Sequence, residues 1–172
     1  MDLPGVESSG GPLAQGSGVA VGMALAAKMS KELHRIYCVM SDGELNEGAS
    51  WEALMLAAKY HLNNLIAIID RNNIQIDGFS DEVMPLEPLA DKLKAFNWKV
   101  ITIDGHNFQQ IMKAIGQAQK EVGRPTVIIA KTIPGKGVSF MENKFEWHGV
   151  APKPEQIESA LTELKAGFDK LS

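Results

Sequence analysis

Cysteine is almost absent from this sequence. Cys38 is the only cysteine among 172 residues, so no disulfide can form within the chain. The sequence also lacks the positively charged start and following apolar run that are typical of a secretory signal. Together these two absences predict a protein of the cytoplasm, where thiols stay reduced.

Long apolar runs and an excess of basic charge are missing too. The longest apolar stretch, roughly residues 19–29, is shorter than the ~20 residues that cross a bilayer, and Lys28 and Lys31 close it. The formal net charge is -4 and the isoelectric point is about 5.6, with lysine and arginine scattered among acids. We therefore expect neither a membrane span nor a nucleic-acid partner.

Hydrophobic residues, in contrast, make up 45% of the chain. At this length they are enough for one sizeable core, which predicts a single domain over residues 1–172. Six of residues 1–16 are glycine or proline, so we predict that this segment is a loop and expect the chain to begin in the middle of a fold. Residues 15–33 are small and apolar, and they predict a helix packed closely against another backbone.

Short apolar, β-branched runs alternate with segments of helical composition along the rest of the chain. Strands are predicted at residues 35–40, 65–70, 99–104 and 126–132, and further helices at about 50–60, 107–122 and 155–168. This alternation predicts an α/β fold with a mostly parallel sheet flanked by helices.

Polar residues follow the first two predicted strands at the point where each strand ends. Asp42 and Gly43 come after the first strand, and Asn72 comes after the second. Because a right-handed crossover places both strand ends on one edge of the sheet, we expect Asp42 and Asn72 to be neighbours. Their oxygens suit Mg2+, and Gly43 lets the backbone approach a phosphate closely. On the spacing alone, ordinary Asp-Gly and Asn-Asn turns explain these residues at least as well.

A wider pattern surrounds these residues. The segment from Ser41 to Asn73 resembles the thiamin diphosphate fingerprint, Gly-Asp-Gly followed later by Asn-Asn, with Ser41 in place of the first glycine. Five segments are similar to those of transketolases in order and spacing: Leu3-Pro4-Gly5-Val6-Glu7, Gly11-Pro12-Leu13-Ala14-Gln15-Gly16, Asp42-Gly43-Glu44-Leu45-Asn46-Glu47-Gly48, Asn64-Leu65-Ile66-Ala67-Ile68 and Ile76-Asp77-Gly78. The chain therefore resembles the transketolase family, although Ala14 replaces a glycine of that family's Gly-Pro-Leu-Gly-Gln-Gly.

The resemblance implies a thiamin diphosphate-binding fold, here the diphosphate-binding domain truncated on its N-terminal side, with Mg2+ as the second cofactor. It implies a metal site made of the Asp42 and Asn72 side chains and the Ile74 carbonyl. It also implies a set of residues around thiamin diphosphate: Gly11, Leu13, Gly43, Asn72 and Ile76.

Two catalytic residues are implied as well. Glu47 matches the family's acid that communicates across the dimer with the glutamate that activates the aminopyrimidine. An acid that stabilises the start of a helix through the helix dipole is the alternative for Glu47. His148 resembles the histidine of the family's His-Gly-Ala-Pro segment, which faces the diphosphate. Because Val150 interrupts that segment, a histidine in a surface loop is the alternative.

The activity implied is that of a thiamin diphosphate-dependent transferase, which moves a two-carbon ketol group from a ketose phosphate to an aldose phosphate. This chain would supply the diphosphate and magnesium half of the cofactor site. We expect it to form a homodimer or larger oligomer and to be inactive without a partner chain that carries the pyrimidine-binding and C-terminal domains. A piece of a deoxyxylulose-phosphate synthase-like enzyme and a non-catalytic module for thiamin diphosphate binding or dimerisation are the alternatives.

Overall fold

A four-stranded parallel sheet forms the centre of the structure, a computed structural model that describes residues 4–168. The strands are β1 (Ile36–Ser41), β2 (Leu65–Arg71), β5 (Lys99–Asp104) and β6 (Thr126–Lys131). They lie in the order β1-β2-β6-β5, and each strand is parallel to its neighbours. This arrangement confirms the predicted α/β fold with a mostly parallel sheet.

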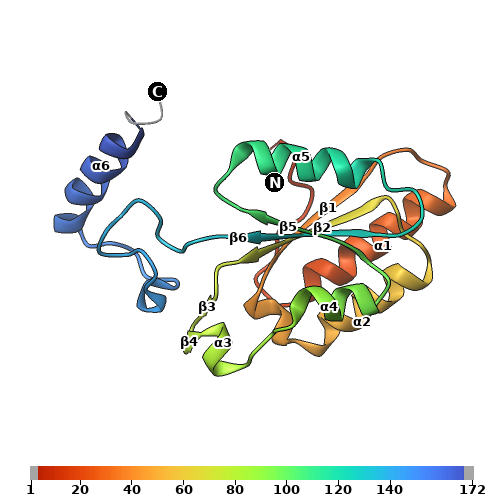
Figure 1. Cartoon of the computed structure of the whole chain (residues 1–172), viewed down its shortest axis with the longest axis horizontal. Coiled ribbons are helices and arrows are strands. Elements are labelled where there is room, and N and C mark those ends of the chain that lie inside the picture. Colours follow the sequence, from red (N-terminus) through yellow and green to blue (C-terminus); the bar gives the residue numbers. More distant parts are fainter. Residues whose placement is uncertain (1–3, 169–172) are drawn as a thin grey trace. The chain divides into compact units, whose positions relative to one another are not determined.

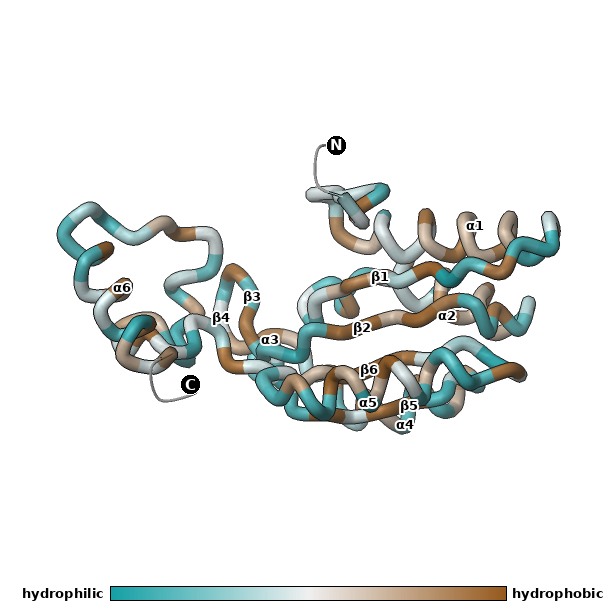
Figure 2. Tube along the Cα trace, turned by 90° about the horizontal axis from the view of Figure 1, so that it is seen from above, coloured by the Kyte–Doolittle hydropathy of each residue, from teal (hydrophilic) through white to brown (hydrophobic). Residues whose placement is uncertain are grey.

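Helices cover both faces of this sheet (Figure 1). On one face lie α1 (Gln15–Met29), α2 (Gly48–Lys59) and α4 (Leu89–Ala95), and on the other lies α5 (Phe108–Gln119). The central strand β2 is hydrophobic along most of its length (Figure 2), as expected for a strand that is covered on both faces.

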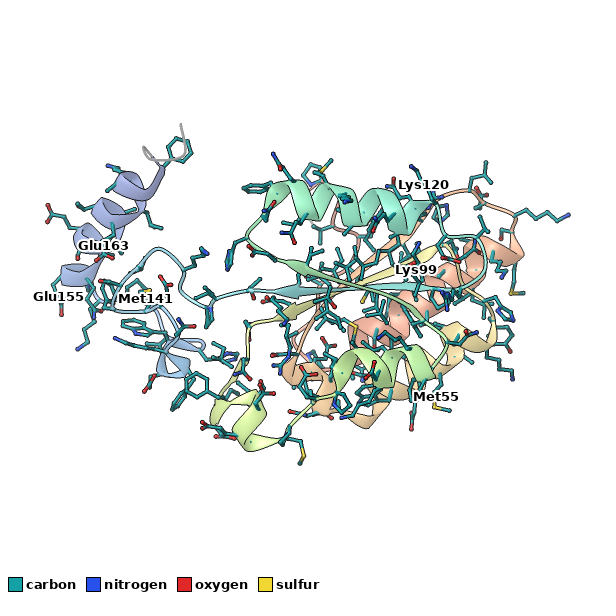
Figure 3. The ribbon with its side chains drawn as sticks, in the orientation of Figure 1. Met55, Lys99, Lys120, Met141, Glu155 and Glu163 are labelled. Atoms are coloured by element: carbon teal, nitrogen blue, oxygen red, sulfur yellow. The ribbon has the colours of Figure 1, made fainter. Side chains whose placement is uncertain are left out.

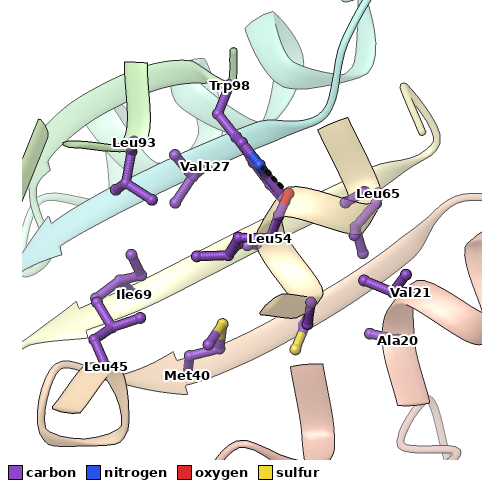
Figure 4. Close-up of a cluster of buried hydrophobic side chains, with 14 of the residues drawn as sticks. Ala20, Val21, Met40, Leu45, Leu54, Leu65, Ile69, Leu93, Trp98 and Val127 are labelled. Carbon is purple, nitrogen blue, oxygen red and sulfur yellow. Dashed lines mark hydrogen bonds between the residues drawn. The ribbon is translucent and has the colours of Figure 1, made fainter. Parts of the chain in front are cut away.

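Successive side chains of the strands point to opposite faces of the sheet, so they contribute to two hydrophobic cores, one on each face. The larger core packs small residues of α1 and α2 against the strands, and Trp98 lies inside it with its Nε1 donating to the Leu54 carbonyl at 2.9 Å (Figure 4). The smaller core packs α5 against the opposite face: Ile66, Ile103, Ala114, Ala118, Ile128 and Ala130. The prediction that the first helix packs closely through small residues is confirmed, since Ala20, Ala24 and Ala27 are buried.

The predicted helices are present, but several of them end earlier than expected. α1 stops at Met29 rather than at residue 33, because Lys31 adopts a left-handed conformation with φ 59°. His61 and Asn97 do the same after α2 and after α4, a helix that was not predicted from the sequence, with φ 49° and 64°. A left-handed residue ends a helix, and glycine is its usual sequence signal. Asparagine also takes this conformation readily, so Asn97 is a signal of a helix end, whereas Lys31 and His61 give no clear signal in the sequence.

The chain divides into two compact units. The first comprises residues 1–71 and 86–132 and contains the sheet, and the second comprises residues 72–85 and 133–172. The second unit holds β3 (Ile74–Gln75), β4 (Gly78–Phe79), α3 (Ser80–Val83), a short 3-10 helix η2 (Phe145–Trp147) and α6 (Pro154–Phe168). Whether the chain is one functional domain stays a prediction.

Two features of the second unit tie its own segments together. Phe79 and Phe145 pack edge to face, with ring centroids 5.6 Å apart. Glu163, which lies on α6 (Figure 3), accepts hydrogen bonds from the backbone N–H and the hydroxyl of Ser139 at 2.6 and 3.0 Å.

Residues 4–14 precede α1 without forming a helix or strand, as predicted for the opening loop. Leu3, the first residue of one segment that resembles transketolases, lies outside the described residues. No helix in the part of the chain from residue 4 to residue 168 is both long and apolar enough to cross a membrane.

Candidate functional site

Asp42 lies directly after β1, at the carboxyl edge of the sheet. It is 0% exposed, and its backbone N–H donates to the Asp70 carbonyl of the neighbouring strand at 3.1 Å. Its Oδ1 accepts from the N–H of Gly43 at 2.8 Å, which makes Asp42 the cap of a short 3-10 helix, η1 (Gly43–Asn46). We refer to residues 42–47 as the Asp42 loop. A carboxylate in this position is held rigidly and shielded from water.

Arg71, the last residue of β2, contacts this carboxylate. Its Nη1 lies 2.6 Å from Oδ2 of Asp42, and both side chains are buried, 7% and 0% exposed. Its Nη2 lies 3.5 Å from Oε1 of Glu87, a largely exposed residue. Arg71 was not among the site residues predicted from the sequence. In the pairing of β1 with β2, Ser41 lies opposite Asp70. The next residues, Asp42 and Arg71, therefore also lie opposite each other, and this register would have identified Arg71.

Asn72 and Ile74, the two other predicted metal ligands, belong to the second unit. Asn72 Oδ1 accepts from the N–H of Ile74 at 3.0 Å, so the structure brings these two residues together. Asn73 lies between them in a left-handed conformation, with φ 60°, and its Oδ1 accepts from the N–H of Asp81 at 3.0 Å. The predicted ligand set is thus divided, with Asp42 in the first unit. Ile76, between β3 and β4, is 78% exposed.

The segment that contains Gly11 and Leu13 lies beside the Asp42 loop. Both residues are exposed, and the residue after Leu13, Ala14, is buried. The N–H of Ala14 donates to Oε1 of Glu44 at 2.8 Å, which links the segment to η1 and so to the residues around Gly43. Glu44 is the second functional candidate that the sequence analysis missed. Its position three residues after Ser41 is the signal of a capping box, which the sequence does contain.

Glu47 occupies the N-cap position of α2 and is exposed. Its side chain makes no capping hydrogen bond, while its N–H donates to the Glu44 carbonyl at 3.1 Å. The carboxylate is therefore turned to solvent at the start of a helix, beside the rest of the Asp42 loop. A negative charge at the start of a helix interacts favourably with the helix dipole. This position is therefore compatible with the alternative for Glu47, an acid that stabilises the start of α2.

His148 directly follows η2 and belongs to the second unit. Its side chain is exposed, and its N–H donates to the carbonyl of Phe145 at 2.8 Å. The Phe145 ring packs against Phe79, which follows Ile76 by three residues. Within this unit, the segments that contain Ile76 and His148 are therefore joined through an aromatic contact.

The oxygen donors of the predicted site suit a magnesium ion that also holds phosphate oxygens. Among residues 4–168 there is no group of three or more His, Cys, Asp or Glu side chains that could hold a metal. The predicted ligand set is of another kind, with one buried carboxylate, one amide oxygen and one carbonyl. Mg2+ accepts such a small share of hard protein ligands when phosphate and water complete its shell. By residue type, the donors predicted from the sequence are therefore of the kind that Mg2+ accepts beside a diphosphate.

Comparisons with known proteins identify the family to which the chain belongs. A family model described as the transketolase thiamine diphosphate binding domain matches residues 1–171. The chain is 45% identical over 161 residues to the 6-deoxy-6-sulfo-D-fructose transketolase subunit SqwG of a Clostridium species, covering 94% of this chain and 58% of that protein. A relative from Phocaeicola vulgatus, named as one of the subunits of an apulose-4-phosphate transketolase, is 42% identical over 171 residues, covering 99% of this chain and 61% of the relative.

A solved structure leads to the same family. The transketolase of Campylobacter jejuni superposes with a TM-score of 0.86 at 39% identity, covering 95% of this chain and 26% of that one. The chain thus spans 58% and 61% of the two curated relatives' lengths and about a quarter of the solved transketolase. The breadth of the family match and these identities show that the chain belongs to the transketolase family, within its thiamin diphosphate-binding domain.

Proposed function

We propose that this chain supplies the diphosphate and magnesium half of the cofactor site in an enzyme that transfers a two-carbon ketol group. The donor would be a ketose phosphate and the acceptor an aldose phosphate. The names of the two relatives concern different sugars, a sulfofructose and apulose 4-phosphate, and both contain the word transketolase. A shared cofactor-binding half combined with different sugar-binding residues accounts for that variety.

The buried carboxylate of Asp42 is the observation that carries this proposal. It is 0% exposed at the carboxyl edge of a parallel sheet, the edge at which α/β proteins bind ligands. Asp42, Asn72 and the Ile74 carbonyl would hold Mg2+, and the Gly43 backbone would lie against the diphosphate. Gly11, Leu13 and Ile76 would contact the rest of the cofactor. When bound, thiamin diphosphate supplies the electron sink for carbon–carbon bond cleavage.

Two exposed residues would complete the chemistry on the protein side. Glu47 would relay a proton between the two halves of the assembled enzyme, because its carboxylate faces solvent where a partner chain can cover it. His148 would hold a proton near the reacting carbon. Two relatives are named as transketolase subunits, which supports a partner chain with the pyrimidine-binding and C-terminal domains. The chain alone would then be inactive, and the assembly would be a dimer or larger.

Calorimetric titration with thiamin diphosphate and Mg2+ tests the proposal on the purified chain and on the chain with its partner. We expect Asp42→Asn to abolish Mg2+-dependent binding of the cofactor. Asp91→Asn is the matched control, since Asp91 is an exposed acid that pairs with Lys94 on α4. Equal affinity in the two variants would contradict the metal assignment.

A second measurement addresses the reaction. Ketol transfer should be undetectable for the purified chain and should appear when the partner chain is added. Cofactor binding without any turnover in the presence of the partner would indicate a non-catalytic binding module instead.

A further inference from the structure

Ser41 and Glu44 exchange hydrogen bonds around the start of η1. The Ser41 hydroxyl accepts from the N–H of Glu44 at 3.1 Å, and Oε2 of Glu44 accepts from the N–H of Ser41 at 3.4 Å. This reciprocal pair resembles a capping box that begins one residue before the N-cap Asp42, and it satisfies two backbone donors at the start of a helical turn. Ser41 stands where the fingerprint has glycine, so a flexible position has become a hydrogen-bonded one.

The other carboxylate oxygen of Glu44 reaches a segment 30 residues earlier in the chain. Oε1 accepts from the N–H of Ala14 at 2.8 Å. Ala14 is 4% exposed and adopts a left-handed conformation, with φ 65°, directly before α1. A residue other than glycine in that conformation costs about 1 kcal/mol or more and persists only when its surroundings hold it. The bond to Glu44 is such a restraint.

The backbone of Glu44 is in turn anchored to α2. The hydroxyl of Ser50, a residue that is 0% exposed, donates to the Glu44 carbonyl at 2.9 Å. Nε1 of Trp51 donates to the Leu45 carbonyl at 2.8 Å. In the part of the chain that the structure describes, the Glu44 carboxylate bonds to backbone N–H groups and forms no salt bridge. These contacts indicate that the side chain has a geometric role.

We propose that Glu44 is a positioning residue that locks residues 11–14 to the Asp42 loop and holds both in the arrangement that receives the diphosphate. The two positions that depart from the family's glycines, Ala14 and Ser41, are the two whose N–H groups bond to Glu44. A side chain at each of these two positions restricts the backbone there, and the Glu44 carboxylate accepts a hydrogen bond from each of them. The identity of the ligand rests on the proposed function. The lock, by which we mean the hydrogen bonds from Ala14 and Ser41 to Glu44, is present in the chain without ligand.

Amide hydrogen exchange and cofactor titration on the whole 172-residue chain test this proposal. In Glu44→Ala we expect the Ala14 amide to exchange at least about tenfold faster, because a hydrogen bond to a charged group is lost. The affinity for thiamin diphosphate with Mg2+ should fall by a similar factor. Glu44→Gln keeps one acceptor oxygen and should recover most of both effects, and Ser41→Gly should leave the Ala14 amide protected.

Glu52→Ala is the matched control, because Glu52 is an exposed glutamate on α2, and it should change neither readout. If Glu44→Ala does not fold, Glu44→Met, which fills the same space without an acceptor oxygen, carries the test with the same expected loss of Ala14 protection. Unchanged Ala14 exchange in Glu44→Ala would overturn the lock, and faster exchange in Glu44→Ala with unchanged cofactor affinity would overturn the positioning role. If the wild-type chain binds no thiamin diphosphate even when its partner chain is present, the proposed function fails, and Ala14 exchange alone then supports or overturns the lock.

Discussion

The two units of the chain differ in how far they bury their apolar side chains. In the first unit, α1, α2 and the strands form a continuous core with Trp98 and Leu54 fully enclosed. In the second unit, α6 contains no buried residue, and Ile157, Leu161 and Leu164 are 44–50% exposed.

This difference divides the predicted site residues into two classes. Asp42 and Gly43 stand beside a packed core that restrains them before any ligand binds. Asn72, Ile76 and His148 belong to the unit with little apolar burial of its own. A cofactor site needs rigid support for the groups that hold it, so we expect the first unit to contribute most of the preorganisation.

The largest expected difference is in the free energy of unfolding that is lost when a large apolar side chain is removed from each unit. We expect Trp98→Ala to lower the free energy of unfolding by about 3–5 kcal/mol, because it removes a large side chain that is 1% exposed and leaves a cavity. Leu161→Ala on α6 should cost less than about 1 kcal/mol, since half of that side chain already faces water. Urea unfolding followed by circular dichroism measures both, and equal losses would contradict the comparison.

The buried ion pair offers the next largest effect. Arg71→Leu should lower the free energy of unfolding by about 3 kcal/mol, because it leaves the Asp42 carboxylate buried without its guanidinium partner. Lys94→Leu is the control, and it should cost less than about 1 kcal/mol because its pair with Asp91 is exposed.

Adding Mg2+ to the Arg71→Leu variant tests whether Asp42 is a metal ligand. If Mg2+ binds at Asp42, it should raise the melting temperature of Arg71→Leu more than that of the wild-type chain, since the ion replaces the lost positive charge. An equal response of the two proteins to Mg2+ would count against Asp42 as a ligand.

In the second unit, the hydrogen bonds from Ser139 to Glu163 should have a smaller and more local effect. Glu163→Ala should cost about 1 kcal/mol and should speed amide exchange at Ser139, which loses its acceptor. Amides of the sheet should keep their protection. A loss of protection in β2 or β6 would mean that the two units unfold together.

The smallest expected effect concerns Cys38 and high pH. Burial, and then the charge of Glu44, raise the pKa of the Cys38 thiol from its ordinary value of 9.0 to about 11. The folded chain therefore binds this proton more tightly than the unfolded chain, and stability should fall as pH rises from about 9 to about 11. We expect Cys38→Ala to weaken that decline, as measured by urea unfolding at several pH values. The same slope in both proteins would exclude Cys38 as its source.

Much of the sheet could be predicted from residue types alone. The strand predicted at residues 99–104 is found with the same bounds, and the other three differ by a residue at one or both ends. β-branched, apolar runs predict buried strands because the preference is local and repeated over several residues. The turn of Ile74–Gln75 with Gly78–Phe79 and the short helices α3 and α4 were not predicted, because each is too short to show periodicity.

The alternation of strands and helices, and the place of Asp42 directly after a strand, follow from residue types because both depend on neighbouring residues. The surroundings of that carboxylate depend on how the chain folds. Arg71 reaches Asp42 because β1 and β2 pair in one particular register. Glu44 reaches Ala14 because packing of α1 against α2 and β1 brings together segments that lie 30 residues apart. Contacts of this kind depend on the folded backbone, and no local pattern of residues encodes them.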